Sequence, residues 1–204
     1  MTWPSYSSAC RKDINALLKK GGSLSAYRAS SSFPTWIGPK KNSQAWLLEG
    51  DIEKKFNVRH AIAVNSGTAA LHVALVAGLA KSRSAAREII TSPYTFSATA
   101  SAILLAGYTP VFADVDPYTF CITKETVKRV ITKKTAAILP VHLFGYFQDL
   151  SELKSLGLPI IEDACQSVGA SRGGHFSGTV GDAGAYSFNG GKNIPSGEGG
   201  CLIT

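Results

Sequence analysis

The stretch His60-Ala-Ile-Ala-Val64-Asn-Ser-Gly-Thr68-Ala-Ala-Leu71 runs from a short apolar segment into the start of a helical pattern. His60 to Val64 is typical of a buried strand, and apolar residues on helical spacing continue from Thr68 to Ala80. Small and polar residues separate the two at Asn65-Ser-Gly-Thr68. A strand that passes through such a turn into a helix is the repeating unit of an α/β fold.

The same order of strand and helix repeats along the chain. Strands that are apolar throughout, alternating with helices, indicate a mainly parallel sheet with helices on both faces. We therefore predict a three-layer α/β/α fold with a mainly parallel mixed sheet. The further strands are expected at 88–91, 110–114, 136–142, 158–163, 183–188 and 201–204, and helices at 46–56, 96–106, 123–135 and 149–156.

The two ends of the chain depart from this pattern. A short helix is expected over 5–20 and an irregular, Ser-, Pro- and Gly-rich segment after it, so that 1–45 is a separate N-terminal region. Residues 46–204 are expected to form a large domain that is incomplete at its C-terminal end. This expectation rests on Cys201-Leu-Ile-Thr204, a strand pattern that no helix or tail follows.

The composition narrows the classes of protein to consider. At 204 residues and 45% hydrophobic residues, the chain can build one sizeable core. No apolar run approaches the roughly 20 residues that span a bilayer, and the N-terminus lacks a signal-peptide pattern, so we expect a cytoplasmic protein without a membrane partner. The net charge is +7, but basic residues occur singly or in pairs without interleaved aromatic residues, so nucleic acid is not expected as a partner. The spacing of the four cysteines and four histidines matches no metal site, and no metal is expected.

Polar residues follow most of the predicted strands. In open α/β sheets, ligands bind beyond the carboxyl ends of the strands. These polar residues should therefore converge on one crevice. They are Asn65-Ser-Gly-Thr68, Pro93-Tyr-Thr-Phe96, Asp114-Val-Asp116, His142, Glu162-Asp163 and the loop around Lys192.

The loop around Lys192 is the glycine-rich stretch Ser187-Phe-Asn-Gly-Gly-Lys192-Asn-Ile-Pro-Ser-Gly-Glu-Gly-Gly200. Glycine lets the backbone approach a bound ligand closely. A lysine that is desolvated or held near other charge can attack a carbonyl carbon. The alternative is a flexible, solvated loop with an ordinary surface lysine.

Further positions have a chemical and a structural interpretation. Ser66-Gly67-Thr68-Ala69 at a helix start offers free amides to a phosphate, with Thr68 as the cap, or it is a plain N-cap. Asp163 at a strand end pairs with a protonated ring nitrogen, or it forms a salt bridge or a cap. Phe96 stacks on a planar cofactor, or it belongs to the core. For His142, a hydrogen-bonded core residue is favoured, and Glu162 should point away from Asp163 by strand alternation.

Two common nucleotide motifs are excluded by their spacing. A Walker A loop needs glycine and a hydroxyl residue where this chain has Tyr186 and Asn193, and no G-x-G-x-x-G follows an early strand. Ser187, five residues before Lys192, is near enough to share a phosphate with it. A phosphate-cradling helix, an aspartate at a strand end and a loop lysine, in this chain order, fit an enzyme that uses pyridoxal 5'-phosphate (PLP).

Seven blocks in order strengthen this interpretation. The chain resembles the DegT/DnrJ/EryC1/StrS family of sugar aminotransferases, within the aspartate aminotransferase-like fold, from about Leu24 to its end. The blocks are Val64-Asn-Ser-Gly-Thr-Ala-Ala-Leu71, Tyr94-Thr-Phe-Ser-Ala-Thr99, Pro110-Val-Phe-Ala-Asp-Val-Asp116, Pro140-Val-His-Leu-Phe-Gly145, Ile161-Glu-Asp-Ala-Cys-Gln-Ser-Val-Gly-Ala170, Gly181-Asp-Ala-Gly-Ala-Tyr-Ser-Phe188 and Lys192-Asn-Ile-Pro-Ser-Gly-Glu-Gly-Gly200.

The resemblance implies a role for each matching residue. Lys192 would bond covalently to PLP and later carry a proton between the substrate carbon and the cofactor. Asp163 would keep the pyridine nitrogen protonated, and Phe96 would stack on the ring. The remaining contacts implied are Gln166 at the oxygen side of the ring, and Gly67, Thr68, Ala69 and Ser187 at the phosphate. Some relatives have histidine at the lysine position and perform dehydration, so Lys192 favours amino transfer.

The resemblance implies amino transfer, with glutamate as the expected donor, to a keto sugar attached to a nucleotide. The resemblance implies that family members continue beyond the lysine loop with a smaller C-terminal domain and form homodimers, so we expect the large domain to be incomplete here and the smaller domain to be absent. Cys165 also departs from the family, which often has alanine at this position. Two alternatives stay open: a catalytically inactive fragment, and a regulatory protein that binds PLP without turnover.

Overall fold

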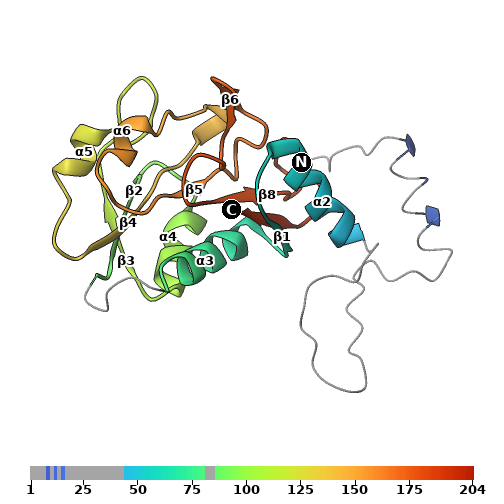
Figure 1. Cartoon of the computed structure of the whole chain (residues 1–204), viewed down its shortest axis with the longest axis horizontal. Coiled ribbons are helices and arrows are strands. Elements are labelled where there is room, and N and C mark those ends of the chain that lie inside the picture. Colours follow the sequence, from blue (N-terminus) through green and yellow to red (C-terminus); the bar gives the residue numbers. More distant parts are fainter. Residues whose placement is uncertain (1–7, 10–11, 13–14, 17–43, 81–85) are drawn as a thin grey trace, which may run out of the picture.

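The computed structural model describes residues 8–9, 12, 15–16, 44–80 and 86–204. The predicted N-terminal helix over 5–20 and the irregular segment before residue 44 lie largely outside these residues. The described chain forms a sheet with helices packed against it (Figure 1). The predicted helix at 46–56 is confirmed as α2, Gln44–Phe56, which begins two residues earlier than expected.

The central sheet is mainly parallel, as predicted. One part has the strand order β3-β2-β4 and the other β1-β9-β8-β5. Parallel bridges between Ile138 and Ile160 and between Val141 and Asp163 join β4 to β5, which makes the two parts continuous. Within these pairings only β9 runs antiparallel to its neighbours. The strands are β1 Ala61–Val64, β2 Glu88–Thr91, β3 Thr109–Phe112, β4 Thr135–Leu139, β5 Ile161–Asp163, β8 Ala183–Ser187 and β9 Gly200–Ile203.

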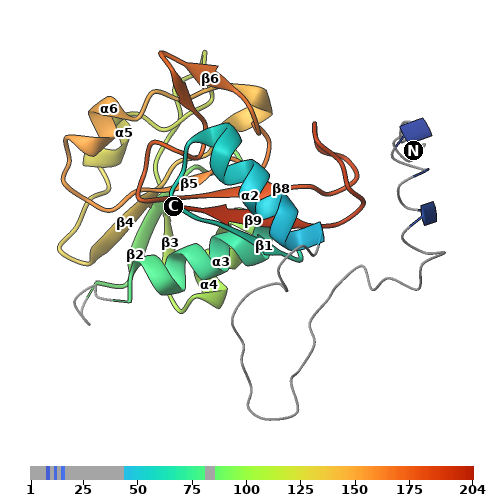
Figure 2. The same cartoon turned by 45° about the vertical axis from the view of Figure 1, so that its right-hand side comes forward.

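Helices cover both faces of the sheet, which confirms the three-layer arrangement. Helices α3, Gly67–Gly78, and α4, Ser97–Leu105, lie on one face (Figure 2). Helix α2 and the short helices α5, Lys124–Lys128, and α6, Ser151–Lys154, lie on the other. Because successive side chains of a strand point to opposite faces, neighbouring residues of β8 and β9 pack against different helices. Ala185 and Leu202 pack with α3, whereas Tyr186 and Ile203 pack with α2.

The helix predicted over 123–135 is wrong in extent, because only Lys124–Lys128 is α-helical. Its start is as the sequence suggests, since Thr123 and Thr126 form a reciprocal capping box. The chain then leaves the helix through β-branched residues and makes a turn in which Thr135 Oγ1 accepts a hydrogen bond from the Thr132 amide at 2.9 Å. Thr135 itself begins strand β4, so the helix prediction ran into the following strand.

A small β-hairpin and a short 3-10 helix were not predicted. Strands β6, Ser171–Arg172, and β7, His175–Phe176, form an antiparallel hairpin. Gly173 and Gly174 turn between them with φ of 58° and 82°, conformations that glycine adopts readily. A 3-10 helix, η1, follows β4 at Leu143–Gly145. Among the described residues, no helix is long and apolar enough to cross a membrane.

Alanine substitutions at two glycines test the packing, because they are expected to change the free energy of unfolding in opposite directions. A Cβ on Gly184 would lie 2.1 Å from the carbonyl oxygen of Gly178, whereas a Cβ on Gly50 in α2 would meet nothing within 4 Å. Gly184→Ala is expected to lower the free energy of unfolding by about 3 kcal/mol or more, because backbone must shift to admit the methyl group. Gly50→Ala is expected to raise it by about 0.5–1 kcal/mol, since glycine is the poorer helix former. Chemical denaturation measures both, and equal effects of the two substitutions would contradict this packing.

Candidate active site

A cavity of about 310 Å³ opens where several strands of the sheet end. Strands β1, β5 and β8 point the same way, because β9 is antiparallel to β1 and β8 while β5 is parallel to β8. Their carboxyl ends therefore meet on one side, as expected for a ligand site in this class of fold. The cavity is lined by Ser66, Gly67, Thr68, Leu71, Phe96, Ala98, Thr99, Asp163, Cys165, Gln166, Ser187, Asn189, Gly191, Lys192 and Glu198.

The N-terminus of α3 forms one wall of the cavity. The cap is Ser66 rather than the predicted Thr68, and its Oγ accepts a hydrogen bond from the Ala69 amide at 3.1 Å. Ala69 is thus engaged within the cap and does not line the cavity. Within the described chain, the amides of Gly67 and Thr68 donate no hydrogen bond, so these two N–H groups are available to an anion.

Gly67 lies where no side chain fits. A Cβ at this position would be 2.7 Å from Cys165 Sγ and 2.8 Å from Ser187 Cβ. The absence of a side chain brings the helix N-terminus directly against Ser187, which is 6% exposed at the end of β8. The hydroxyl of Ser187 and the free amides of α3 are therefore adjacent.

Asp163 lies on the floor of the cavity, where β5 ends. It is 5% exposed, and both of its carboxylate oxygens accept hydrogen bonds. Oδ1 accepts from the Cys165 amide at 3.1 Å, and Oδ2 accepts from Thr99 Oγ1 at 2.7 Å. Cys165 is itself buried, and burial, followed by the charge of Asp163, raises the pKa of its thiol well above the usual value. The thiol is therefore neutral at physiological pH and is a poor nucleophile.

Lys192 lies on a loop that the structure holds in place, which argues against the flexible, solvated alternative. The loop is closed by backbone hydrogen bonds from Gly190 to the Gly197 carbonyl at 2.8 Å and from Lys192 to the Asn189 carbonyl at 2.9 Å. The Asn189 side chain donates to Glu198 Oε1 at 2.7 Å. Lys192 is half-buried, and its positive charge lowers the pKa of Cys165, against the larger effects of burial and Asp163.

Phe96 and Gln166 line the opening of the cavity. Phe96 is 65% exposed at the N-cap of α4, so it is not a core residue, and its ring is available to stack on a ligand. Gln166 is half-buried, and its Oε1 accepts a hydrogen bond from the Phe144 amide at 3.3 Å.

The prediction that all polar residues after the strands converge is wrong in part. Outside the loop around Lys192, the polar residues of that set that do not line the cavity are Asn65, Tyr94, Thr95, Asp114, Asp116, His142 and Glu162. His142 is a fully buried core histidine, as favoured from the sequence, and its Nε2 lies 2.7 Å from Glu162 Oε2. Glu162 points away from Asp163, as strand alternation predicted. Asp116 instead caps its own turn by accepting hydrogen bonds from the amides of Thr119 and Tyr118, and these bonds, chiefly the one from Thr119, lower its pKa.

Thr99 was not predicted as a lining residue, and Asn189 and Glu198 were predicted only as part of the loop around Lys192, not individually. Thr99 had a signal in the sequence, because it follows Phe96 by three positions in a predicted helix and thus lies on the same helical face. Which side chains of the loop would face the cavity had no signal in the sequence, since the positions of Asn189 and Glu198 depend on the path of the glycine-rich loop. In the part of the chain that the structure describes, no three His, Cys, Asp or Glu side chains are grouped to hold a metal ion.

Sequence comparison identifies related proteins. A model of the DegT/DnrJ/EryC1/StrS aminotransferase family matches residues 34–204. The chain is 42% identical over 163 residues to a pleiotropic regulatory protein of Geobacillus stearothermophilus, a match that covers 77% of this chain and 43% of that protein. It is 41% identical over 179 residues to the GDP-perosamine synthase of Caulobacter vibrioides, a match that covers 83% of this chain and 46% of the synthase. The chain thus spans less than half the length of these curated relatives.

Solved structures show the same fold. The aminotransferase from Psychrobacter cryohalolentis superimposes with a TM-score of 0.84 at 33% sequence identity, covering 100% of this chain and 49% of that chain. The E. coli GDP-4-keto-6-deoxy-D-mannose-3-dehydratase, solved with bound hydrated PLP, has a TM-score of 0.79 at 25% identity, covering 100% of this chain and 51% of that chain.

Proposed function

The chain belongs to the DegT/DnrJ/EryC1/StrS aminotransferase family, and we propose that it acts in PLP-dependent transfer of an amino group, from glutamate, to a keto sugar linked to a nucleotide. The observation that carries this proposal is the grouping of Lys192, Asp163 and the α3 N-terminus around one cavity. Residues 46–204 would be the PLP-binding large domain, and we propose that the protein works as a homodimer in the cytoplasm.

The cavity fits PLP at each of its functional groups. The phosphate would be held by the free amides of Gly67 and Thr68 and by the Ser187 hydroxyl, which lie next to each other because Gly67 has no side chain. Phe96 would cover one face of the ring. Asp163 would accept a hydrogen bond from the protonated ring nitrogen. Gln166 would contact the ring at its oxygen side, and the Ala69 amide would support the phosphate only through the cap that it forms with Ser66.

PLP, when bound, supplies an aldehyde that captures primary amines and a ring that withdraws electrons from the carbon next to the captured nitrogen. The residues of the chain would supply the rest. The amine of Lys192 would act as the covalent anchor and then as the base that takes a proton from the donor carbon and returns it. Asp163 would keep a proton on the ring nitrogen, and the buried floor around Cys165 would exclude water.

The names of the relatives support a nucleotide sugar as the acceptor. One relative, the GDP-perosamine synthase, is named after a sugar nucleotide that it makes. Another, a UDP-N-acetyl-3-dehydro-α-D-glucosamine 3-aminotransferase, is named after a keto-sugar nucleotide that it acts on. The family resemblance places Lys192 at the position where some relatives have histidine and perform dehydration, so the lysine supports amino transfer over dehydration.

A second candidate function is regulation by a PLP-binding protein without turnover. The similarity to the pleiotropic regulatory protein of Geobacillus stearothermophilus favours it. The cavity would serve equally well to bind PLP in either case, so only turnover separates the two.

A spectroscopic titration followed by a turnover assay tests the proposal. Addition of PLP to the purified protein is expected to give a saturable visible absorption band. Addition of glutamate should bleach the band and release 2-oxoglutarate, and a keto-sugar nucleotide should restore it. A band that glutamate leaves unchanged would favour the regulatory function, and the absence of any band would exclude both.

A further inference from the structure

Two threonine hydroxyls form a chain that ends at Asp163. Thr99 Oγ1 lies 2.7 Å from Asp163 Oδ2, and Thr95 Oγ1 lies 2.8 Å from Thr99 Oγ1. Thr99 is 1% exposed, whereas Thr95 is half-buried. A carboxylate only accepts hydrogen bonds, so Thr99 uses its single hydroxyl proton toward Asp163. Thr95 must then donate to Thr99, which gives the chain one direction, from Thr95 through Thr99 to Asp163.

Thr99 makes this contact instead of the usual one for its position. Serine and threonine hydroxyls within helices ordinarily donate to the carbonyl four residues earlier. Ser101 on the same helix does so, toward the Ser97 carbonyl at 3.0 Å. The Thr99 hydroxyl is directed to the carboxylate, where a hydrogen bond to a charged acceptor in a buried site is stronger than one to a neutral carbonyl.

The first turn of α4 links this contact to the stacking residue. Phe96 is the N-cap of the helix, and its carbonyl accepts a hydrogen bond from the Thr99 amide at 3.1 Å. The ring that lines the cavity and the donor to Asp163 are thus fixed to each other by one helical turn. The other carboxylate oxygen is held by the Cys165 amide, so Asp163 is clamped from two sides.

We propose that Thr99, supported by Thr95, is a positioning residue that orients Asp163 toward the ring nitrogen of PLP and in register with Phe96. The inference rests on the proposed function. Loss of the Thr99 hydroxyl would leave Asp163 with one tether and free to rotate, so the carboxylate would meet the ring nitrogen less often and hold it less firmly.

The test compares the affinity for PLP of matched threonine variants. Thr99→Val, which keeps the shape and removes the hydroxyl, is expected to weaken PLP binding about tenfold. Thr99→Ser should bind within about threefold of the unsubstituted protein, because it keeps the donor. Thr91→Val is the matched control: Thr91 is equally buried and donates to the Leu139 carbonyl at 2.8 Å, away from the cavity. It should leave the affinity unchanged.

A cofactor analogue separates positioning from a merely structural role. With 1-deazapyridoxal phosphate, in which carbon replaces the ring nitrogen, the tenfold difference between Thr99→Val and the unsubstituted protein should disappear, because Asp163 has no partner to hold. An equal loss of affinity for PLP and for the analogue would mean that Thr99 supports the fold only, and would overturn the proposal. Thr95→Val, at a half-buried position, should weaken PLP binding about threefold and keeps the test valid if Thr99→Val fails to fold.

The outcomes distinguish this inference from the proposed function. If the unsubstituted protein does not bind PLP, the proposed function fails and the role of Thr99 fails with it. If it binds PLP and Thr99→Val binds as tightly as Thr91→Val, the proposed function stands and the positioning role alone is overturned.

Discussion

Replacing Lys192 by alanine is expected to lower the rate of amino transfer by about 10⁴-fold or more, because one side chain would act both as covalent anchor and as proton carrier. Sodium borohydride treatment of the PLP-loaded protein, followed by peptide mass spectrometry, should place the cofactor on the peptide that contains Lys192. Lys192→Ala should lose this label. The free energy of unfolding should change by less than about 0.5 kcal/mol, since the side chain is half-buried in a loop held by other residues.

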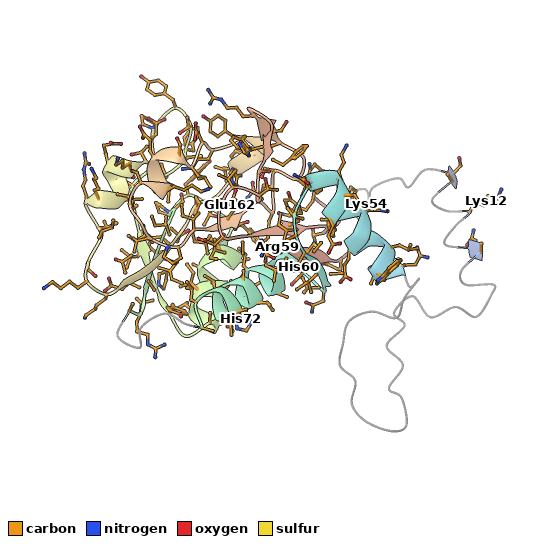
Figure 3. The ribbon with its side chains drawn as sticks, in the orientation of Figure 1. Lys12, Lys54, Arg59, His60, His72 and Glu162 are labelled. Carbon is orange, nitrogen blue, oxygen red and sulfur yellow. The ribbon has the colours of Figure 1, made fainter. Side chains whose placement is uncertain are left out.

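Lys54→Ala is the matched control for this substitution. Lys54 lies exposed on α2, on the face of the sheet that α3 does not cover, and it does not line the cavity (Figure 3). This variant should keep both the label and the rate. Borohydride labelling of another lysine, or amino transfer that survives Lys192→Ala, would show that Lys192 is not the anchor.

Much of the fold could be predicted because strand and helix patterns are local properties of the sequence. The apolar runs at 61–64 and 183–187 both form strands, and their alternation with helices specifies a parallel sheet. The strand at 183–187 is fully buried, whereas the prediction of a buried strand at 61–64 is wrong in part, because only Ala61 is buried and Ile62 is exposed. The end of α5 could not be predicted, because the hydrophobic spacing of Val127, Val130 and Ile131 suits a helix and a turn equally well. The turn is decided by the pairing of Thr132 with Thr135.

The candidate site was predicted less completely than the fold. Asp163, Phe96 and Lys192 could be singled out from the sequence, because each stands after a predicted strand or in a glycine-rich turn. The cap of α3 was assigned to Thr68 rather than Ser66, since both are hydroxyl residues and only the backbone conformation at Ser66 distinguishes them. The direction of the Glu162 side chain could be predicted from the alternation of side chains along a strand. The direction of the Asp116 side chain could not, because it depends on a turn formed by the residues that follow it.

Glu162 gives the other large expected effect, on stability. It lies in the middle of the molecule (Figure 3) and is fully buried. Its carboxylate accepts hydrogen bonds from His142 Nε2 at 2.7 Å, from the Gly178 amide at 2.8 Å, from the Val180 amide at 2.6 Å and from the Gly181 amide. His142 Nδ1 in turn accepts from the Gln148 amide at 3.0 Å, so the imidazole is neutral with its proton on Nε2.

Glu162→Gln is expected to lower the free energy of unfolding by about 3 kcal/mol. Glutamine keeps one acceptor oxygen, but its NH₂ group would face N–H donors that have no other partner, and each unsatisfied buried donor costs about 1–3 kcal/mol. The negative charge of Glu162 is also felt by Tyr186, since burial and then this charge raise the pKa of the phenol. Chemical denaturation at neutral pH measures the loss. Glu152→Gln, at an exposed position on α6, should change the free energy by less than about 0.5 kcal/mol.

A double-mutant cycle assigns the loss to the network rather than to a local change of shape. Because Glu162 and His142 share one hydrogen bond, Glu162→Gln combined with His142→Phe should cost less than the sum of the two single substitutions by more than about 1 kcal/mol. Additive effects would contradict the network.

Glu162 and Asp163 are adjacent on β5 and face opposite sides of the sheet, so the carboxylate that ties β5 to the loop at 178–181 also fixes the backbone that carries Asp163. Glu162→Gln should therefore weaken PLP binding as well, although its side chain never reaches the cavity.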